Sequence, residues 1–130
     1  MNRFSELSEL LENAWCPYSG FQVASVAVTR DGRSFPGVNV ESAAYPTTMC
    51  AERGAIFAAV ADGCRPGEIV EVHILARDSA GKFVSATPCG ACRQVIAEQS
   101  LNGAEVFVYD ASGKFERYRI SELLPKVFAL

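Results

Sequence analysis

Histidine, long apolar runs and basic clusters are scarce in this 130-residue chain. The single histidine, His73, stands inside an expected strand, which favours a structural role for its ring. No hydrophobic run approaches the roughly 20 residues of a membrane-spanning helix. The N-terminal sequence MNRFSELSELLENAW is acidic and amphipathic, without the basic and then apolar order of a signal peptide. We therefore expect a cytoplasmic protein that has no membrane partner.

The charge balance excludes one further class of partner. Twelve lysines and arginines stand against 15 aspartates and glutamates, for a formal net charge of −3, and no basic block occurs. A protein that binds nucleic-acid polymers normally presents a positive surface to the phosphates. We therefore expect no nucleic-acid polymer as a partner.

No repeat, low-complexity segment or linker divides the sequence. Its length predicts one domain, residues 1–130, with a workable core. Hydrophobic periodicity predicts helices and strands in the order helix, strand, strand, helix, strand, helix, strand, strand, helix. The expected helices are residues 3–14, 48–62 and 90–99, and the segment 121–128 is expected to hold a short closing helix that Pro125 stops. The expected strands are residues 21–28, 35–40, 68–76, 104–110 and 115–120.

Two of the expected helices connect strands, which implies a partly parallel sheet. Thr48 is the expected N-cap of the first of these helices, and Gly63 suits its end. Helices on both faces of such a sheet make three layers. The expected fold class is therefore α/β, a three-layer α/β/α sandwich with a mixed five-stranded central sheet.

The five cysteines carry the clearest chemical signal. In a reducing cytosol, clustered cysteines indicate metal or redox chemistry rather than disulfides. Cys50 and the pair Cys89 and Cys92 stand at expected helix starts, where free N–H groups and the helix dipole stabilise a thiolate. Three such thiolates suit a tetrahedral zinc ion whose fourth position stays open, as at a catalytic site.

The other two cysteines fit this cluster poorly. Cys64 follows Cys50 on the same expected helix, roughly 21 Å away at 1.5 Å per residue. Cys16 is next to Pro17, and we expect it to be structural.

Charged residues beside the cysteines suggest how such a site would work. Zinc with three thiolates carries a net charge of −1, which is unfavourable for lowering the pKa of bound water. Arg53, three residues after Cys50, can donate hydrogen bonds to the thiolates, and we expect Arg93 to do the same. Glu52 can point at the open position and move a proton from water to a substrate nitrogen.

Cys50-Ala51-Glu52 followed by Pro88-Cys89-x-x-Cys92 matches the signature of zinc-dependent deaminases. The segments CAER, PCGACRQ, PYSGF, GVNVESAAY and ELLPKVF resemble cytidine deaminases of the small, homotetrameric, three-cysteine type. The resemblance covers nearly the whole chain. It implies hydrolytic deamination of cytidine and 2′-deoxycytidine in pyrimidine salvage, with one Zn²⁺ and a catalytic water per chain.

The resemblance also implies residue roles, with Cys50, Cys89 and Cys92 as zinc ligands and Glu52 as the proton shuttle. For the base, the resemblance implies that Phe21 stacks on the ring, that the N–H of Ala51 bonds to pyrimidine O2 and that the carbonyl of Thr87 accepts from the leaving amino group. For the sugar, it implies that Asn39 and Glu41 bond to the ribose hydroxyls. It also implies that Phe128 reaches into the site of a neighbouring subunit. The sites would then lie at subunit interfaces of a homotetramer.

Departures from the family pattern leave the exact substrate open. The usual stretch resembles N-x-E-N-A-S-Y-G, whereas residues 39–46 read NVESAAYP. Pro46 restricts φ and removes one N–H donor just before the expected zinc helix. A modified cytosine nucleoside such as blasticidin S is therefore an alternative substrate.

Two alternatives come from other classes of protein. A thiol redox protein could use the CGAC motif at Cys89 and Cys92, but it would leave Cys50 and Glu52 without a task. A structural zinc module that binds a partner would need a fourth protein ligand, which the sequence does not offer.

Overall fold

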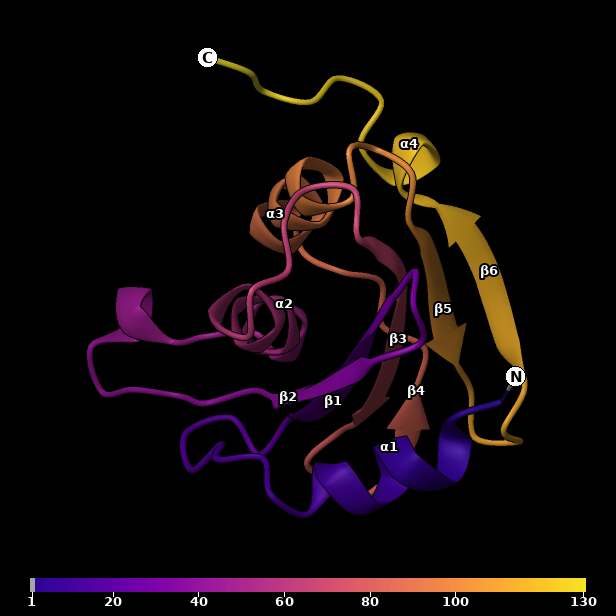
Figure 1. Cartoon of the computed structure of the whole chain (residues 1–130). Helices are drawn as coiled ribbons and strands as arrows, with labels where there is room; N and C mark the ends of the chain where they lie inside the picture. Colours follow the sequence, from indigo (N-terminus) through magenta and orange to yellow (C-terminus); the bar gives the residue numbers. More distant parts are fainter. Residues whose placement is uncertain (1) are drawn as a thin grey trace.

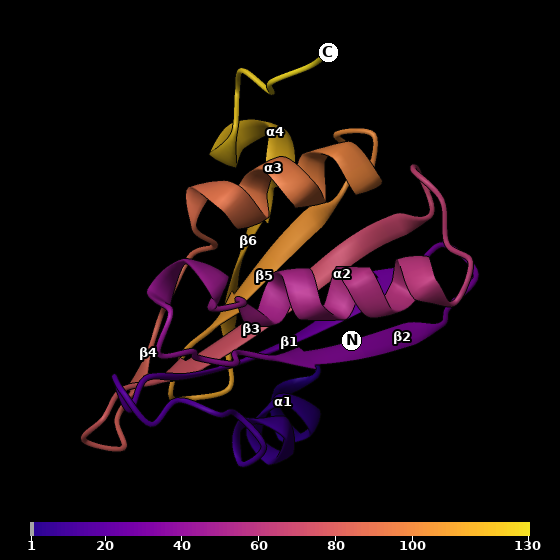
Figure 2. The same cartoon turned by 90° about the vertical axis from the view of Figure 1, so that its left-hand side faces the viewer.

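The computed structural model describes residues 2–130, which form three layers (Figures 1 and 2). Helix α1 covers one face of a six-stranded mixed sheet, and α2 and α3 cover the other. The helices are α1 (Phe4–Leu11), η1 (Tyr45–Thr47, a 3₁₀ turn), α2 (Ala51–Ala61), α3 (Gly90–Gln99) and α4 (Ile120–Leu123). The strands are β1 (Gln22–Thr29), β2 (Ser34–Val38), β3 (Ile69–Arg77), β4 (Phe83–Val84), β5 (Glu105–Tyr109) and β6 (Phe115–Arg119).

The strand order places the starts of α2 and α3 at the same end of the sheet, where β2 and β3 finish. The order is β2-β1-β3-β5-β6, with β1 antiparallel to both β2 and β3, and β3 parallel to β5. Strands β2 and β3 therefore point in the same direction. Because α2 follows β2 and α3 comes after β3, both helices begin near the carboxyl ends of these strands, where α/β sheets commonly bind ligands.

Alternating side chains of β1 divide the core between the two faces. Ala27 packs in the cluster beneath α2 and α3, together with Ile56 and Ile96. Val26 and Val28 belong to the opposite cluster, with Leu7 and Leu11 of α1. This period of two is the expected pattern for a strand that is buried on both faces.

The structure confirms the α/β class and differs from the expectations in detail. The sheet has six strands rather than five, because β4 adds a two-residue antiparallel pair to β3 that is too short to show alternation. Helix α1 ends at Leu11, earlier than expected, and α4 ends at Leu123, just before Pro125.

The prediction of Thr48 as a helix N-cap is wrong, because α2 begins later with Cys50 in that position. Met49 is extended and exchanges both backbone hydrogen bonds with Val40, at 2.9 and 3.0 Å. The Thr48 hydroxyl instead accepts the N–H of Ser42 at 3.1 Å. Pairing with a distant segment has therefore overridden the local capping preference.

Within residues 2–130, no helix has the combination of length and apolar character that crossing a membrane requires.

His73 is a buried histidine of β3, 1% exposed. Its Nδ1 lies 2.8 Å from the Tyr109 hydroxyl and its Nε2 lies 2.9 Å from a carboxylate oxygen of Glu71. The ring stacks on Phe107 with 4.4 Å between centroids. Burial lowers the pKa of His73, although Glu71 opposes this effect. These contacts bear out the structural role expected for this ring.

The lowered pKa predicts a pH-dependent stability. Below about pH 6.5 the unfolded chain protonates this histidine before the folded one does, so the free energy of unfolding decreases as the pH falls. The slope has an upper bound of about 1.4 kcal/mol per pH unit, the value for one proton. His73→Phe keeps the stacked ring and removes the titration. Urea unfolding of both proteins from pH 8 to 5 should show the smaller decrease in the variant, and parallel curves would contradict this.

Candidate active site

Three cysteines meet where α2 and α3 begin. Cys50 is the N-cap of α2, Cys89 is the N-cap of α3, and Cys92 lies in the first turn of α3. Their sulfur atoms all lie within 4.8 Å of one another, and those of Cys50 and Cys89 are 3.7 Å apart. The topology thus assembles the cluster, because it brings both helix starts to the same end of the sheet.

The spacing of the sulfurs fits zinc. Tetrahedral coordination with Zn–S bonds of about 2.3 Å requires sulfurs about 3.8 Å apart. Within residues 2–130, no other histidine, cysteine or carboxylate belongs to this cluster. Cys16 and Cys64 are free and lie outside it. Three thiolates and an open fourth position form the donor set of a catalytic rather than a structural zinc ion.

Hydrogen bonds and a nearby cation favour a thiolate at Cys50. A hydrogen bond from the Cys92 thiol and another from Arg53 lower the pKa of Cys50 to about 5. Arg53 donates through Nη2 to Cys50 Sγ at 3.3 Å. The Cys50 thiolate and burial together raise the pKa of Cys92. In the metal-free chain the first thiolate therefore forms at Cys50.

Arg93 does not make the contact expected from its place after Cys92. Its guanidinium donates to the carbonyls of Pro88 and Leu123, at 2.7 and 2.8 Å, and to the Thr87 hydroxyl at 3.3 Å. These partners come from the segment before α3 and from α4. Arg93 therefore braces the segment that leads into the cysteine pair instead of bonding to sulfur.

Glu52 lies in the first turn of α2 and is only 5% exposed. Burial raises the pKa of its carboxyl group to about 7, and the negative charge of Cys50 adds to this effect. A group that titrates near neutral pH both takes and releases protons efficiently. Glu52 therefore has the burial and the pKa that a general acid and base requires.

A cavity of about 230 Å³ is lined by Cys50, Cys89 and Glu52. Four of the expected substrate contacts line it: Phe21, Asn39, Ala51 and Thr87. The lining also contains Thr48, which was expected only as a helix cap, and four residues that the sequence did not single out, since they carry no reactive group: Val23, Met49, Ile74 and Ala86. A larger hollow of about 600 Å³, between α3 and the C-terminal tail, lacks both the cysteines and Glu52, so size alone does not identify the site.

Asn39 is part of the cavity wall and also bonds to the chain on either side of the start of β1. Its side-chain oxygen accepts the N–H of Val23 at 2.8 Å, and its amide nitrogen donates to the carbonyl of Phe21 at 2.7 Å. These two bonds use half of the hydrogen-bonding capacity of the amide. One N–H and one lone pair remain for a ligand.

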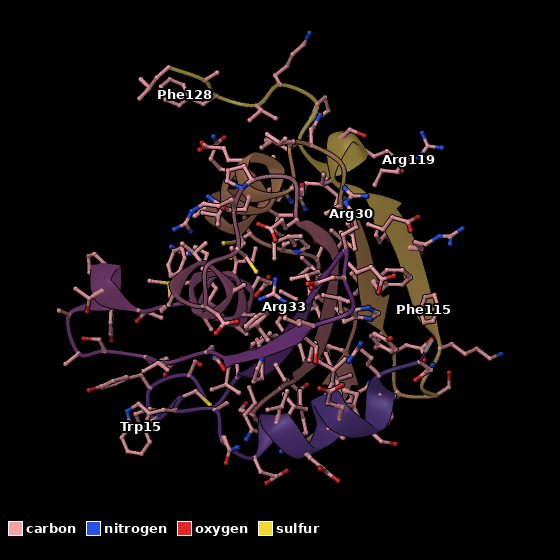
Figure 3. All side chains as sticks on the ribbon, in the orientation of Figure 1. Trp15, Arg30, Arg33, Phe115, Arg119 and Phe128 are labelled. Carbon is pink, nitrogen blue, oxygen red and sulfur yellow. The ribbon has the colours of Figure 1, made fainter. Side chains whose placement is uncertain are left out.

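The other two expected contacts lie outside this lining. Glu41 borders an adjacent hollow of about 390 Å³, which shares Thr48 with the cavity. Phe128 is 66% exposed on the C-terminal tail, which extends away from the sheet (Figure 3). Its backbone is held to α3 by two hydrogen bonds with the side chain of Gln94.

Comparisons with known proteins agree with this site. Residues 2–109 match the model of a family described as the cytidine and deoxycytidylate deaminase zinc-binding region. A curated relative, a cytidine deaminase from Sporosarcina psychrophila, is 38% identical over 125 residues, which cover 96% of this chain and 88% of the relative.

Solved structures give the same result at the level of the fold. The cytidine deaminase of Burkholderia pseudomallei is 38% identical, with a TM-score of 0.86 over 95% of this chain and 94% of that one. The cytidine deaminase of Mycobacterium tuberculosis is 30% identical, with a TM-score of 0.73 over 98% of each chain. With a cysteine cluster that fits zinc and a family match over most of its length, the chain belongs to the cytidine and deoxycytidylate deaminase family.

Proposed function

We propose that this protein is a cytidine deaminase, which hydrolyses cytidine and 2′-deoxycytidine to uridine and 2′-deoxyuridine with release of ammonia. The observation that carries the proposal is the buried Glu52 at the same cavity as Cys50 and Cys89. Relatives named cytidine deaminase, which align with nearly the whole chain, support it. A redox function that uses Cys89 and Cys92 would give Glu52 no role in the reaction.

Cys50, Cys89 and Cys92 would hold one Zn²⁺ per chain. The bound ion would supply Lewis-acid activation of a water molecule, which is the nucleophile of the hydrolysis. The hydrogen bond from Arg53 to Cys50 withdraws negative charge from the ligand set, which a site with three thiolates needs. The cofactors of the reaction are thus Zn²⁺ and the catalytic water.

Glu52 would carry out the proton transfers. As a carboxylate it accepts a proton from the water while the oxygen attacks C4 of the cytosine. As a carboxylic acid it protonates N3. It then takes the proton of the hydroxyl group now bonded to C4 and delivers it to the amino group, and the C4–N bond breaks, so cytidine and water become uridine and ammonia. In the chain without metal, burial raises the carboxyl pKa of Glu52 to about 7, so both forms are available at neutral pH.

The walls of the cavity offer groups for a pyrimidine nucleoside. The ring of Phe21 would stack on the base, the N–H of Ala51 would donate to O2, and the carbonyl of Thr87 would accept from the amino group. The free N–H and lone pair of Asn39 would meet the sugar, together with Glu41. Arg93 would keep the Thr87 segment in place through its bonds to Pro88 and Thr87.

We further propose a cytoplasmic homotetramer that acts in pyrimidine salvage and completes each site with Phe128 from a neighbouring subunit. The support is exposed aromatic surface: Tyr45, Phe57 and Phe128 are all substantially exposed in the single chain. Such surface is typical of protein interfaces. Light scattering at several protein concentrations would test the tetramer.

The function is tested by measuring zinc content and cytidine turnover on one purified sample. We expect about one zinc per chain and a falling ultraviolet absorbance as cytosine becomes uracil. Removing the metal with a chelator should abolish turnover, and added zinc should restore it. Bound zinc without cytidine turnover would contradict cytidine as the substrate. Absence of zinc, together with reactive thiols at Cys89 and Cys92, would favour redox chemistry.

The segment before α2 favours one second candidate, a modified cytosine nucleoside such as blasticidin S. Ser42, Ala44 and Pro46 replace the family's usual residues there, and Pro46 lies in the 3₁₀ turn η1 next to the site. Measured side by side, kcat/KM for cytidine should exceed that for blasticidin S by orders of magnitude. The reverse order would select the second candidate.

A further inference from the structure

The turn before β1, residues 16–20, is fastened to the segment that follows β2. Trp15 donates its N–H to the carbonyl of Asn39 at 3.0 Å, and Glu41 donates its N–H to the carbonyl of Trp15 at 2.7 Å. Both ribbon views show these two segments side by side (Figures 1 and 2). The backbone pairing thus brings the side chain of Glu41 against the turn.

The carboxylate of Glu41 is bonded to this turn through both of its oxygens. Oε1 accepts the N–H groups of Tyr18 and Ser19, at 2.9 and 3.1 Å, and Oε2 accepts the hydroxyl of Ser19. The bonds from Ser19 hold the pKa of Glu41 below its usual range, so the group is anionic at neutral pH. A carboxylate has about four acceptor positions, and the one left belongs to Oε2.

The same serine hydroxyl also reaches the residue that lines the cavity. Ser19 Oγ accepts the N–H of Phe21 at 3.0 Å. The carbonyl of Phe21 accepts from the amide of Asn39. The backbone of Phe21 is therefore held at its nitrogen by Ser19 and at its oxygen by Asn39. One hydroxyl links the anionic Glu41 to the aromatic residue of the site.

We propose that Ser19 is a positioning residue for nucleoside recognition. Its hydroxyl directs Glu41 Oε2, the oxygen with a free acceptor position, toward a sugar hydroxyl and holds the backbone of Phe21 for the base. The inference rests on the proposed function and adds to it a residue that lies outside the cavity lining. Ser19 acts through Glu41, so its effect depends on whether the substrate has sugar hydroxyls to offer.

The kinetic test compares Ser19→Ala with the wild type on cytidine and on 2′,3′-dideoxycytidine, which lacks both ring hydroxyls. We expect KM for cytidine to rise roughly three- to tenfold, the size of one ordinary net hydrogen bond, because Ser19 acts through Glu41, with kcat within about twofold. KM for the dideoxynucleoside should change much less. Ser19→Thr keeps a hydroxyl and should recover most of the cytidine KM. An equal rise with both substrates would leave Ser19 with an effect on the base through Phe21 alone and would overturn sugar recognition through Glu41.

A second measurement separates this inference from the proposed function. Titration of the Glu41 carboxyl group by NMR should give a higher pKa in Ser19→Ala than in the wild type, with recovery in Ser19→Thr. An unchanged Glu41 pKa in an active enzyme overturns the role of Ser19 alone. Absence of cytidine turnover by the wild-type protein would overturn the proposed function. Sugar recognition through Ser19 would then be overturned as well, even if the NMR titration shows the expected change in the Glu41 pKa.

Discussion

Glu52→Gln is expected to lower kcat for cytidine by about 10²–10⁴-fold, the range for loss of a positioned general acid and base. Glutamine has nearly the same shape, but it cannot exchange protons with water or with the base. The three cysteines are unchanged, so about one zinc per chain should remain. Steady-state turnover and metal analysis on the same preparation would measure both quantities.

Stability gives an independent measure of the same substitution. Burial raises the pKa of Glu52 to about 7, so ionisation of this group destabilises the folded chain relative to the unfolded chain. This destabilisation develops as the pH rises from about 4.3 through 7. The glutamine variant should therefore be at least as stable as the wild type at pH 8.

Glu9→Gln is the matched control, since Glu9 is exposed on α1, on the opposite face of the sheet. Turnover in this variant should equal that of the wild type. Substantial activity in Glu52→Gln, or loss of its zinc, would contradict the proposed role of this glutamate.

Gly37→Ala is expected to destabilise the fold by about 1–3 kcal/mol or more, as overpacking does. A Cβ on Gly37 would overlap the carbonyl oxygen of Ala51 and the backbone nitrogen of Ala55. These are backbone atoms of α2, so relief requires the whole helix to move. The helix carries Cys50 at its start and Glu52 in its first turn. We therefore expect weaker zinc binding and lower kcat/KM together with the loss of stability.

Gly54→Ala is the matched control at the same contact between helix and strand. A Cβ on Gly54 would meet nothing closer than 3.8 Å. Alanine in a helix interior is favoured over glycine by about 1 kcal/mol, so this variant should be as stable as the wild type or more so. Urea unfolding and zinc titration of both variants would test the pair. A Gly37→Ala protein that matches the wild type in both measurements would show that α2 does not need this close approach.

The sequence was informative for the site residues and the element order, whose signals lie within a few residues. Cys50 with Glu52, and Cys89 with Cys92, were recognisable as site residues because spacing along a helix determines which side chains share its first turn. The order of helices and strands followed from hydrophobic periodicity for the same reason. Only the two-residue β4 lay below the length at which alternation can be seen.

Tertiary structure decided which distant backbone groups each side chain meets. Arg93 bonds to Pro88 and Leu123 because α4 packs near the start of α3, which no local pattern predicts. Thr48 lost its expected capping role to the pairing of Met49 with Val40. The need for glycine at position 37 exists only because α2 lies directly on β2. Local spacing determines the direction of a side chain, whereas pairing across the sheet determines its partners. Only the folded chain brings the three sulfurs together.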